Sequence, residues 1–124
     1  MLSHIAILME NQPGALSRVV GLFSQRGYNI DSLSVAPTQD PTLSRLTMTT
    51  SENPEIINQI LRQLYKLVDV VMVQNLSDAE AYSIELAIIK LVSSREKIEK
   101  IISQAKELEG KILDNKDDHI MFEI

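Results

Sequence analysis

Residues 10–30 read "ENQPGALSRVVGLFSQRGYNI" and contain the transition on which the fold depends. Residues 4–9 before it alternate between two faces, which is typical of a strand. A polar stretch then runs into Pro13-Gly14, and Gly27 is placed to end the following helix in a left-handed turn. The apolar residues of that helix recur at the spacing of a single helical face: Leu16, Val19, Val20 and Phe23. The stretch therefore predicts a strand, a turn and a helix in succession.

Four further elements are predicted between this helix and residue 75. A second strand covers residues 30–36 and stops at Pro37, and residues 45–50 alternate as a third strand. Asn53-Pro54-Glu55 carries the signals of a helix start, with a capping side chain, a proline and an acid. Residues 67–74 give a last strand, so residues 1–76 are predicted to form one βαββαβ domain.

The pattern restarts after a predicted linker at residues 77–83. Residues 84–92 indicate a strand, and a helical stripe follows at residues 98, 101, 102, 105 and 108, which Gly110 is expected to end. Residues 111–115 and 119–124 suggest a hairpin. Residues 84–124 thus predict a partial second α+β unit, βαββ, that repeats the first half of the domain before it. The expected fold class is α+β.

Composition excludes several classes of function. The chain has 124 residues, a net charge of -5, 4% aromatic residues and no cysteine. An acidic chain with few aromatic side chains argues against a nucleic-acid partner. No apolar run approaches the roughly 18 residues that would span a bilayer, and the first residues lack a basic segment typical of a signal peptide. We expect a cytoplasmic protein with no membrane partner.

The start of the first predicted helix has the chemistry of an anion site. The first amides of a helix lack intrahelical partners, and with Gly14 at the turn the N–H groups of Gly14, Ala15 and Leu16 are unscreened. Asn11 is placed either to cap the helix or to offer its amide to a ligand. Asn29 begins the next strand, where it could reach a ligand from a neighbouring subunit. Spacing alone favours the alternative, an ordinary turn and cap at a helix start, over a ligand site.

No arrangement of catalytic or metal-binding residues is found. His4 and His119 are far apart in sequence and lie on strand patterns, so we expect packing or exposure for both. Asp69 is expected at a strand edge, and Asp117-Asp118 at a turn. No glycine-rich phosphate loop is present. The sequence therefore predicts no catalytic site and no metal site.

Residues 10–50, "ENQPGALSRVVGLFSQRGYNIDSLSVAPTQDPTLSRLTMTT", closely resemble the N-terminal ACT domain of the acetolactate synthase (acetohydroxyacid synthase) small-subunit family. The continuation "QILRQLYKLVDVVMV", residues 59–73, fits as well, and the resemblance covers about residues 4–75. Residues 84–124 look like the front part of the second domain of that family. The resemblance implies a ferredoxin-like βαββαβ ACT domain.

The resemblance also implies a function. Subunits of this family bind a large catalytic subunit of branched-chain amino acid biosynthesis, raise its activity and confer feedback inhibition by valine or another branched-chain amino acid. This chain would be non-catalytic and carry no cofactor, because thiamine diphosphate, magnesium and FAD belong to the large subunit. A free-standing ACT module that binds another small molecule and another partner is the alternative.

The family's ligand site carries over onto the matched residues. ACT domains of this family pair side by side into a homodimer with one continuous sheet, and the amino acid lies at the pairing interface. Gly14, Ala15 and Leu16 would receive the valine carboxylate with Asn11 nearby. Asn29 and Ile30 of the opposing subunit would complete the site.

Overall fold

The computed structural model describes residues 2–77, 80–82 and 84–124. It divides into two compact units, residues 1–81 and residues 82–124, called unit 1 and unit 2 below. The predicted linker at 77–83 includes residues 78–79 and 83, which lie outside the described residues. The elements of unit 1 are β1 (Ser3–Glu10), α1 (Ala15–Arg26), β2 (Ser32–Pro37), β3 (Leu43–Thr50), α2 (Pro54–Leu64) and β4 (Val70–Asn75). The predicted βαββαβ order is confirmed.

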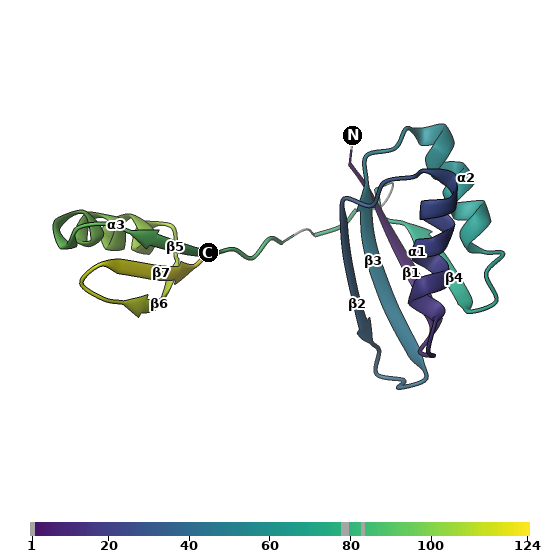
Figure 1. The fold of residues 1–124 in the computed structure, drawn as a ribbon, viewed down its shortest axis with the longest axis horizontal. Coiled ribbons are helices and arrows are strands. Elements are labelled where there is room, and N and C mark those ends of the chain that lie inside the picture. The colour runs from purple at the N-terminus through teal and green to yellow at the C-terminus, as the bar shows by residue number, and fades with distance from the viewer. Residues whose placement is uncertain (1, 78–79, 83) are drawn as a thin grey trace. The chain divides into compact units, whose positions relative to one another are not determined.

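The sheet of unit 1 has the strand order β2-β3-β1-β4, and all neighbouring strands are antiparallel. Both helices lie on the same face of this sheet (Figure 1). Ile7 lies opposite Leu46 on β3 and Val73 on β4, so the apolar face of every inner strand turns toward the helices. The fully buried residues of the core include Ile5, Ile7, Val19, Leu46, Met48, Ile60 and Leu64.

Helix α1 buries a face that overlaps the predicted one. Its buried residues are Ala15, Val19, Leu22 and Phe23, whereas Val20 is 37% exposed. Residues 15, 19, 22 and 23 also follow the helical period, so the sequence offered two overlapping stripes. Val20 therefore lies at the margin of the buried stripe, and Leu22 takes its place in the core.

The ends of both helices follow the predicted local signals. Gly27 follows α1 with φ 68°, and its N–H donates to the carbonyl of Ser24. Asn53 caps α2, because its side-chain oxygen accepts a hydrogen bond from the Ile56 N–H at 2.9 Å. Strand β4 begins three residues later than predicted, because residue 67 accepts a turn hydrogen bond from Val70.

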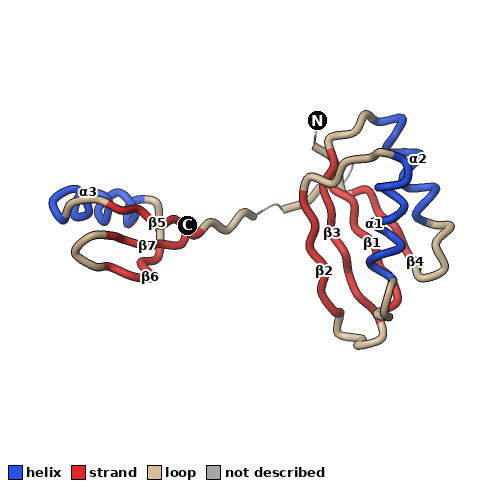
Figure 2. The backbone as a smooth tube through the Cα atoms, in the orientation of Figure 1, coloured by secondary structure: helices blue, strands red, loops and turns tan. Residues whose placement is uncertain are grey.

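Unit 2 contains β5 (Ile88–Val92), α3 (Arg95–Glu107), β6 (Lys111–Asn115) and β7 (His119–Glu123). Its sheet has the order β5-β7-β6, and α3 covers one face of it. The last strand of the βαββ path lies between the other two, as β3 lies between β1 and β2 in unit 1. The predicted repeat is therefore visible in the topology (Figure 2).

Two boundaries in unit 2 differ from the prediction. Strand β5 begins at Ile88 and not at residue 84, and both Ile84 and Leu86 are largely exposed. Helix α3 ends at Glu107, and Glu109 takes the left-handed conformation expected at Gly110, with φ 58°. Gly110 is required for another reason, since an added Cβ would lie 2.9 Å from the Ala105 carbonyl oxygen. Among the described residues, no helix is long and apolar enough to cross a membrane.

Candidate functional site

The loop between β1 and α1 opens the helix without a side-chain cap. Gly14 occupies the N-cap position with φ 84° and ψ -11°, a left-handed conformation that favours glycine. The Asn11 side chain does not reach the helix; its Nδ2 donates to the Pro41 carbonyl at 3.0 Å. The Asn11 N–H donates to the Thr42 carbonyl at 2.7 Å. The capping alternative for Asn11 is therefore wrong, and Asn11 instead ties this loop to the turn between β2 and β3.

Two of the three predicted amides at this helix start have no hydrogen-bond partner among the described residues. The Ala15 N–H donates to the Gln12 carbonyl at 3.2 Å. For the N–H groups of Gly14 and Leu16, no hydrogen-bond partner is found among the residues that the structure describes. Since no acidic residue lies in the first turn of α1, the electropositive helix start is uncompensated on its own helix.

A pocket of 240 Å³ lies beside this helix start, between α1 and the end of β2. It brings together three of the predicted residues, Asn11, Ala15 and Leu16. Sequence reasoning missed the rest of the lining: Met9, Glu10, Gln12, Val35, Ala36, Pro37 and Ser44. The signal that could have found them is strand register, because Ser44 lies opposite both Met9 on β1 and Pro37 on β2.

Gly14 also lies close to the guanidinium of Arg18. A Cβ added at Gly14 would lie 2.8 Å from Arg18 Nη1. Arg18 makes a two-point ion pair with Asp69, with Nε–Oδ2 at 2.5 Å and Nη2–Oδ1 at 2.9 Å. The Asp69 carbonyl also accepts a hydrogen bond from the Glu10 N–H at 2.8 Å. Asp69 therefore holds both ends of the loop between β1 and α1.

Asp69 was expected at a strand edge, and it lies in the turn directly before the edge strand β4. The sequence did not predict its burial, since its side chain is only 4% exposed. The hydrogen bond from Arg18 lowers the pKa of the Asp69 carboxyl, and the same bond raises the pKa of Arg18. The pair is therefore fully charged at neutral pH.

Asn29 and Ile30 lie at the opposite end of unit 1 from Gly14. The Asn29 carbonyl accepts a hydrogen bond from Thr50 at the end of β3, whereas Asn11 contacts Thr42 before β3 begins. Strand β3 has 8 residues, which corresponds to about 26 Å. The Asn29 side chain donates to Asp31 Oδ1 at 2.8 Å. Within one chain, the predicted site residues are thus divided between two distant places.

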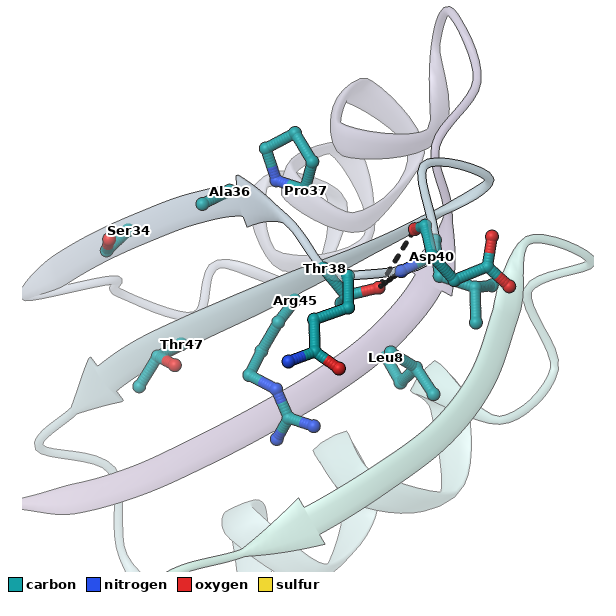
Figure 3. A pocket seen from close by; sticks show the side chains of 10 residues that line it. Leu8, Ser34, Ala36, Pro37, Thr38, Asp40, Arg45 and Thr47 are labelled. Atoms are coloured by element: carbon teal, nitrogen blue, oxygen red, sulfur yellow. Dashed lines mark hydrogen bonds between the residues drawn. The ribbon is translucent and has the colours of Figure 1, made fainter.

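A larger hollow of 670 Å³ lies on the face of the sheet that the helices leave open (Figure 3). Leu8, Thr47 and Arg45 line its floor, and residues 37–40 form its rim. Thr38 and Asp40 hold this rim by reciprocal hydrogen bonds. The hydroxyl and N–H of Thr42 lower the pKa of the Asp40 carboxyl. None of the predicted ligand residues lines this hollow.

His119 of unit 2 lies between two carboxylates. Its Nδ1 is 2.7 Å from Asp118 Oδ1, and its Nε2 is 3.2 Å from Asp114 Oδ2. Within residues 2–77, 80–82 and 84–124, no group of three or more acidic, histidine or cysteine side chains could hold a metal ion. The contact with Asp114 joins the two strands of the β6–β7 hairpin, and Asp118 lies in the turn between them.

The strand order β2-β3-β1-β4, with both helices on one face, defines unit 1 as an ACT domain. Residues 5–72 match the family model described as the AHAS small subunit-like ACT domain. The acetolactate synthase isozyme 3 small subunit of Salmonella typhimurium is 46% identical over 110 residues, which cover 89% of this chain and 68% of that protein. The acetolactate synthase small subunit of Haemophilus influenzae is 49% identical over 113 residues, again 89% of this chain and 68% of that protein.

The chain belongs to the acetolactate synthase small-subunit family. The crystal structure of the small subunit from Thermotoga maritima matches 100% of this chain and 78% of its own length, with a TM-score of 0.83 and 30% identity. The resemblance seen in the sequence is confirmed. Family membership is consistent with a regulatory, non-catalytic role, and it implies a catalytic large-subunit partner.

Proposed function

We propose that this chain is a cytoplasmic regulatory subunit that binds the catalytic large subunit of acetolactate synthase and activates it. It also confers feedback inhibition by valine, or by another branched-chain amino acid, bound where two ACT domains pair. One observation carries the proposal: α1 begins at a left-handed Gly14 with unpaired amides, beside a pocket lined by Asn11 and Leu16.

The pocket has the chemistry of an aliphatic amino acid. The free N–H groups at the start of α1 and the helix dipole favour the ligand carboxylate. Glu10 is the carboxylate in the lining and supplies an acceptor for the ligand ammonium. Leu16, Val35 and Pro37 offer apolar surface to the ligand side chain. Because one methylene is worth about 1–3 kcal/mol, this surface can rank valine, leucine and isoleucine.

The edge of the sheet beside the pocket supports a paired site. Every residue of β2 is exposed, and Leu33 and Val35, on the helix-covered face, are each 40% exposed. A second copy that pairs its β2 antiparallel to this one would bury both side chains and extend the sheet across both chains.

Such a two-fold pairing would also reunite the divided residues. Antiparallel strands bring the beginning of one β2 beside the end of the other. Asn29 and Ile30 precede β2, and the pocket lies at its end, so the second copy would contribute both residues to this pocket. A ligand held by two chains favours the pairing geometry that it fits, and the large subunit would respond to that geometry.

The cofactors belong to the partner in this proposal. Thiamine diphosphate, FAD and magnesium are assigned to the large subunit, which carries out the condensation. This chain contributes effector binding and contact with the large subunit, and no step of the reaction.

Thermal unfolding with added amino acids tests the ligand half of the proposal. A ligand that binds only the folded protein raises its melting temperature. At a hundredfold excess over Kd, the ligand adds about 2.7 kcal/mol to the free energy of unfolding. We expect L-valine, L-leucine or L-isoleucine at millimolar concentration to raise the melting temperature, and D-valine, the matched control, to leave it unchanged. An unchanged melting temperature with all three L-amino acids would contradict the proposed ligand binding.

A valine titration of large-subunit activity, with and without this chain, tests the other half. We expect this chain to raise the activity and to make it sensitive to valine. A large subunit that is indifferent to this chain would favour the alternative, a free-standing ACT module with another ligand and partner.

A further inference from the structure

A groove of 540 Å³, distinct from the pocket and the hollow described above, runs along the helical face of unit 1 between α1 and the end of α2. The two helices lie next to each other on that face (Figure 1). Three cations line the groove: Arg18 and Arg26 on α1, and Lys66 just after α2. No acidic residue lines it, although the chain as a whole has a net charge of -5. The groove is therefore a basic site on an acidic protein.

Two of the three cations are free to bind a partner. Arg18 is paired with Asp69. For Arg26 and Lys66, no ion pair is found within the part of the chain that the structure describes. Arg26 Nη2 donates to Gln63 Oε1 at 3.0 Å, which joins the two helices and holds the guanidinium over the groove. Its other N–H groups are left for a carboxylate.

The groove is shaped for a chain and not for a single small anion. Arg18 and Arg26 are eight residues apart on α1, which places them about 12 Å from each other along the helix. Between them Gly21 lines the groove, and a Cβ added at Gly21 would meet nothing within 4 Å. A segment lying there can approach the α1 backbone while its acidic side chains reach the free cations.

We propose that this groove between α1 and α2 docks an acidic segment of the catalytic large subunit. The inference rests on the proposed function, because it takes the large subunit as the partner and adds the surface that holds it. Charge complementarity selects the occupant: the unpaired charges of Arg26 and Lys66 call for carboxylates on the other side.

The groove also lies next to the proposed ligand pocket. Gly14 and Arg18 line one end of it, and Gly14 is the residue at which α1 opens beside the 240 Å³ pocket. A segment in the groove and an amino acid in the pocket would thus contact two sides of one turn. Movement of that turn is the physical route by which one occupant would change the affinity for the other.

A pair of double variants tests the assignment. Arg26→Glu/Lys66→Glu reverses the two free cations of the groove. Arg45→Glu/Arg62→Glu is the matched control, since it makes the same change in net charge at two exposed arginines that do not line the groove. The affinity of each full chain for the large subunit is measured by titration calorimetry at low and physiological salt, together with the melting-temperature shift caused by valine.

We expect the groove variant to bind the large subunit at least tenfold more weakly than wild type, with a flatter dependence on salt. The control should stay within about twofold of wild type, and both variants should keep the valine shift. The proposal is overturned if the groove variant binds normally, if the control loses as much, or if the groove variant changes self-association instead, which would assign the groove to a second copy. Competition by phosphate, but not by chloride of equal ionic strength, would assign it to a small anion and also overturn the proposal.

Failure of the proposed function gives a different result. In that case the wild-type chain itself would not bind the large subunit, and the groove assignment falls with it. Failure of the groove assignment alone leaves wild-type binding and the valine shift in place.

Discussion

Unit 1 and unit 2 both run strand, helix, strand, strand, and in both sheets the last of these strands lies between the other two. They differ at the start of the helix. Four residues join β1 to α1, whereas two residues, Ser93 and Ser94, join β5 to α3. The longer loop carries the left-handed Gly14, while Ser94 is extended with φ -68°.

The charge at the starts of α1 and α3 also differs. Helix α1 has no acid in its first turn, and α3 has Glu96 there. A built-in carboxylate compensates the electropositive end of α3 and would repel a second anion, whereas α1 has no such carboxylate. One chain path thus appears twice, and the proposed ligand site lies at the loop in which the two copies differ. The proposed function therefore depends on this loop and not on the shared fold.

The two units also differ in the size of their cores. Replacing one buried isoleucine with alanine in each unit should therefore show the largest difference in stability between them. Ile98 in unit 2 and Ile60 in unit 1 are both fully buried. Replacing either with alanine costs about 2–5 kcal/mol. The cluster around Ile98 has four buried residues, so we expect Ile98→Ala to unfold unit 2 while unit 1 keeps its fold. Ile60→Ala, in a cluster of 13, should only lower the melting temperature of unit 1.

Two-dimensional amide NMR spectra of both variants, recorded during thermal unfolding, distinguish the signals of the two units. Loss of both sets of signals together in Ile98→Ala would mean that the units do not fold separately.

The two left-handed glycines that flank α1 allow a test of the ligand site itself. Gly14→Asp and Gly27→Asp both force an L side chain into a positive φ, at about 1–3 kcal/mol each, and add the same charge. Only the side chain at 14 meets Arg18, where its carboxylate would compete with Asp69 and, in the proposed site, would repel the ligand carboxylate. We expect Gly14→Asp to abolish valine inhibition. Because Gly14 also lines one end of the proposed docking groove, the variant's activation of the large subunit should weaken, but less than in Arg26→Glu/Lys66→Glu, whereas Gly27→Asp should keep both. Valine inhibition that persists in Gly14→Asp would remove Gly14 from the site.

Local sequence signals predicted much of this molecule, and contacts between distant segments account for the rest. The alternation of residues 4–9 and the cap at Asn53 act within a few residues, so pattern alone located β1 and the start of α2. The Arg18–Asp69 pair joins residues 51 positions apart, and no periodicity reports it. Val35 enters the pocket only through the register of β2 with β3. Likewise, whether Val20 or Leu22 is buried depends on which side of α1 faces the sheet.

The same long-range pair predicts a difference in acid sensitivity between the units. The hydrogen bond from Arg18 lowers the pKa of Asp69 below its ordinary value of 3.8, and the hydrogen bond that Asp118 accepts from His119 lowers the pKa of Asp118. A carboxyl whose folded pKa is lowered stabilises the fold above its unfolded pKa, and this contribution is lost as the pH falls through the folded value. The Asp69 side chain is 4% exposed and that of Asp118 is 80% exposed, so solvent screens the second pair more.

We therefore expect the stability of unit 1 to fall between pH 5 and pH 3 less steeply in Asp69→Asn than in wild type. Asp118→Asn should change the acid dependence of unit 2 by a smaller amount. Urea unfolding at a series of pH values, followed by NMR for each unit, measures both slopes. Equal slopes in Asp69→Asn and wild type would show that the Arg18 pair contributes no pH-dependent stability.

The helix caps give the smallest expected difference between the units. The Asn53 side chain accepts a hydrogen bond from the Ile56 N–H, whereas the Ser94 side chain makes no capping bond at the start of α3. Removing a cap that is in use costs about 1 kcal/mol, since one helix-start donor loses its partner. We expect Asn53→Ala to destabilise unit 1 by about that amount in urea unfolding at pH 7, and Ser94→Ala to leave unit 2 within about 0.5 kcal/mol of wild type. A cost at Ser94 equal to that at Asn53 would mean that its hydroxyl caps α3 in solution, and the starts of α2 and α3 would then not differ in capping.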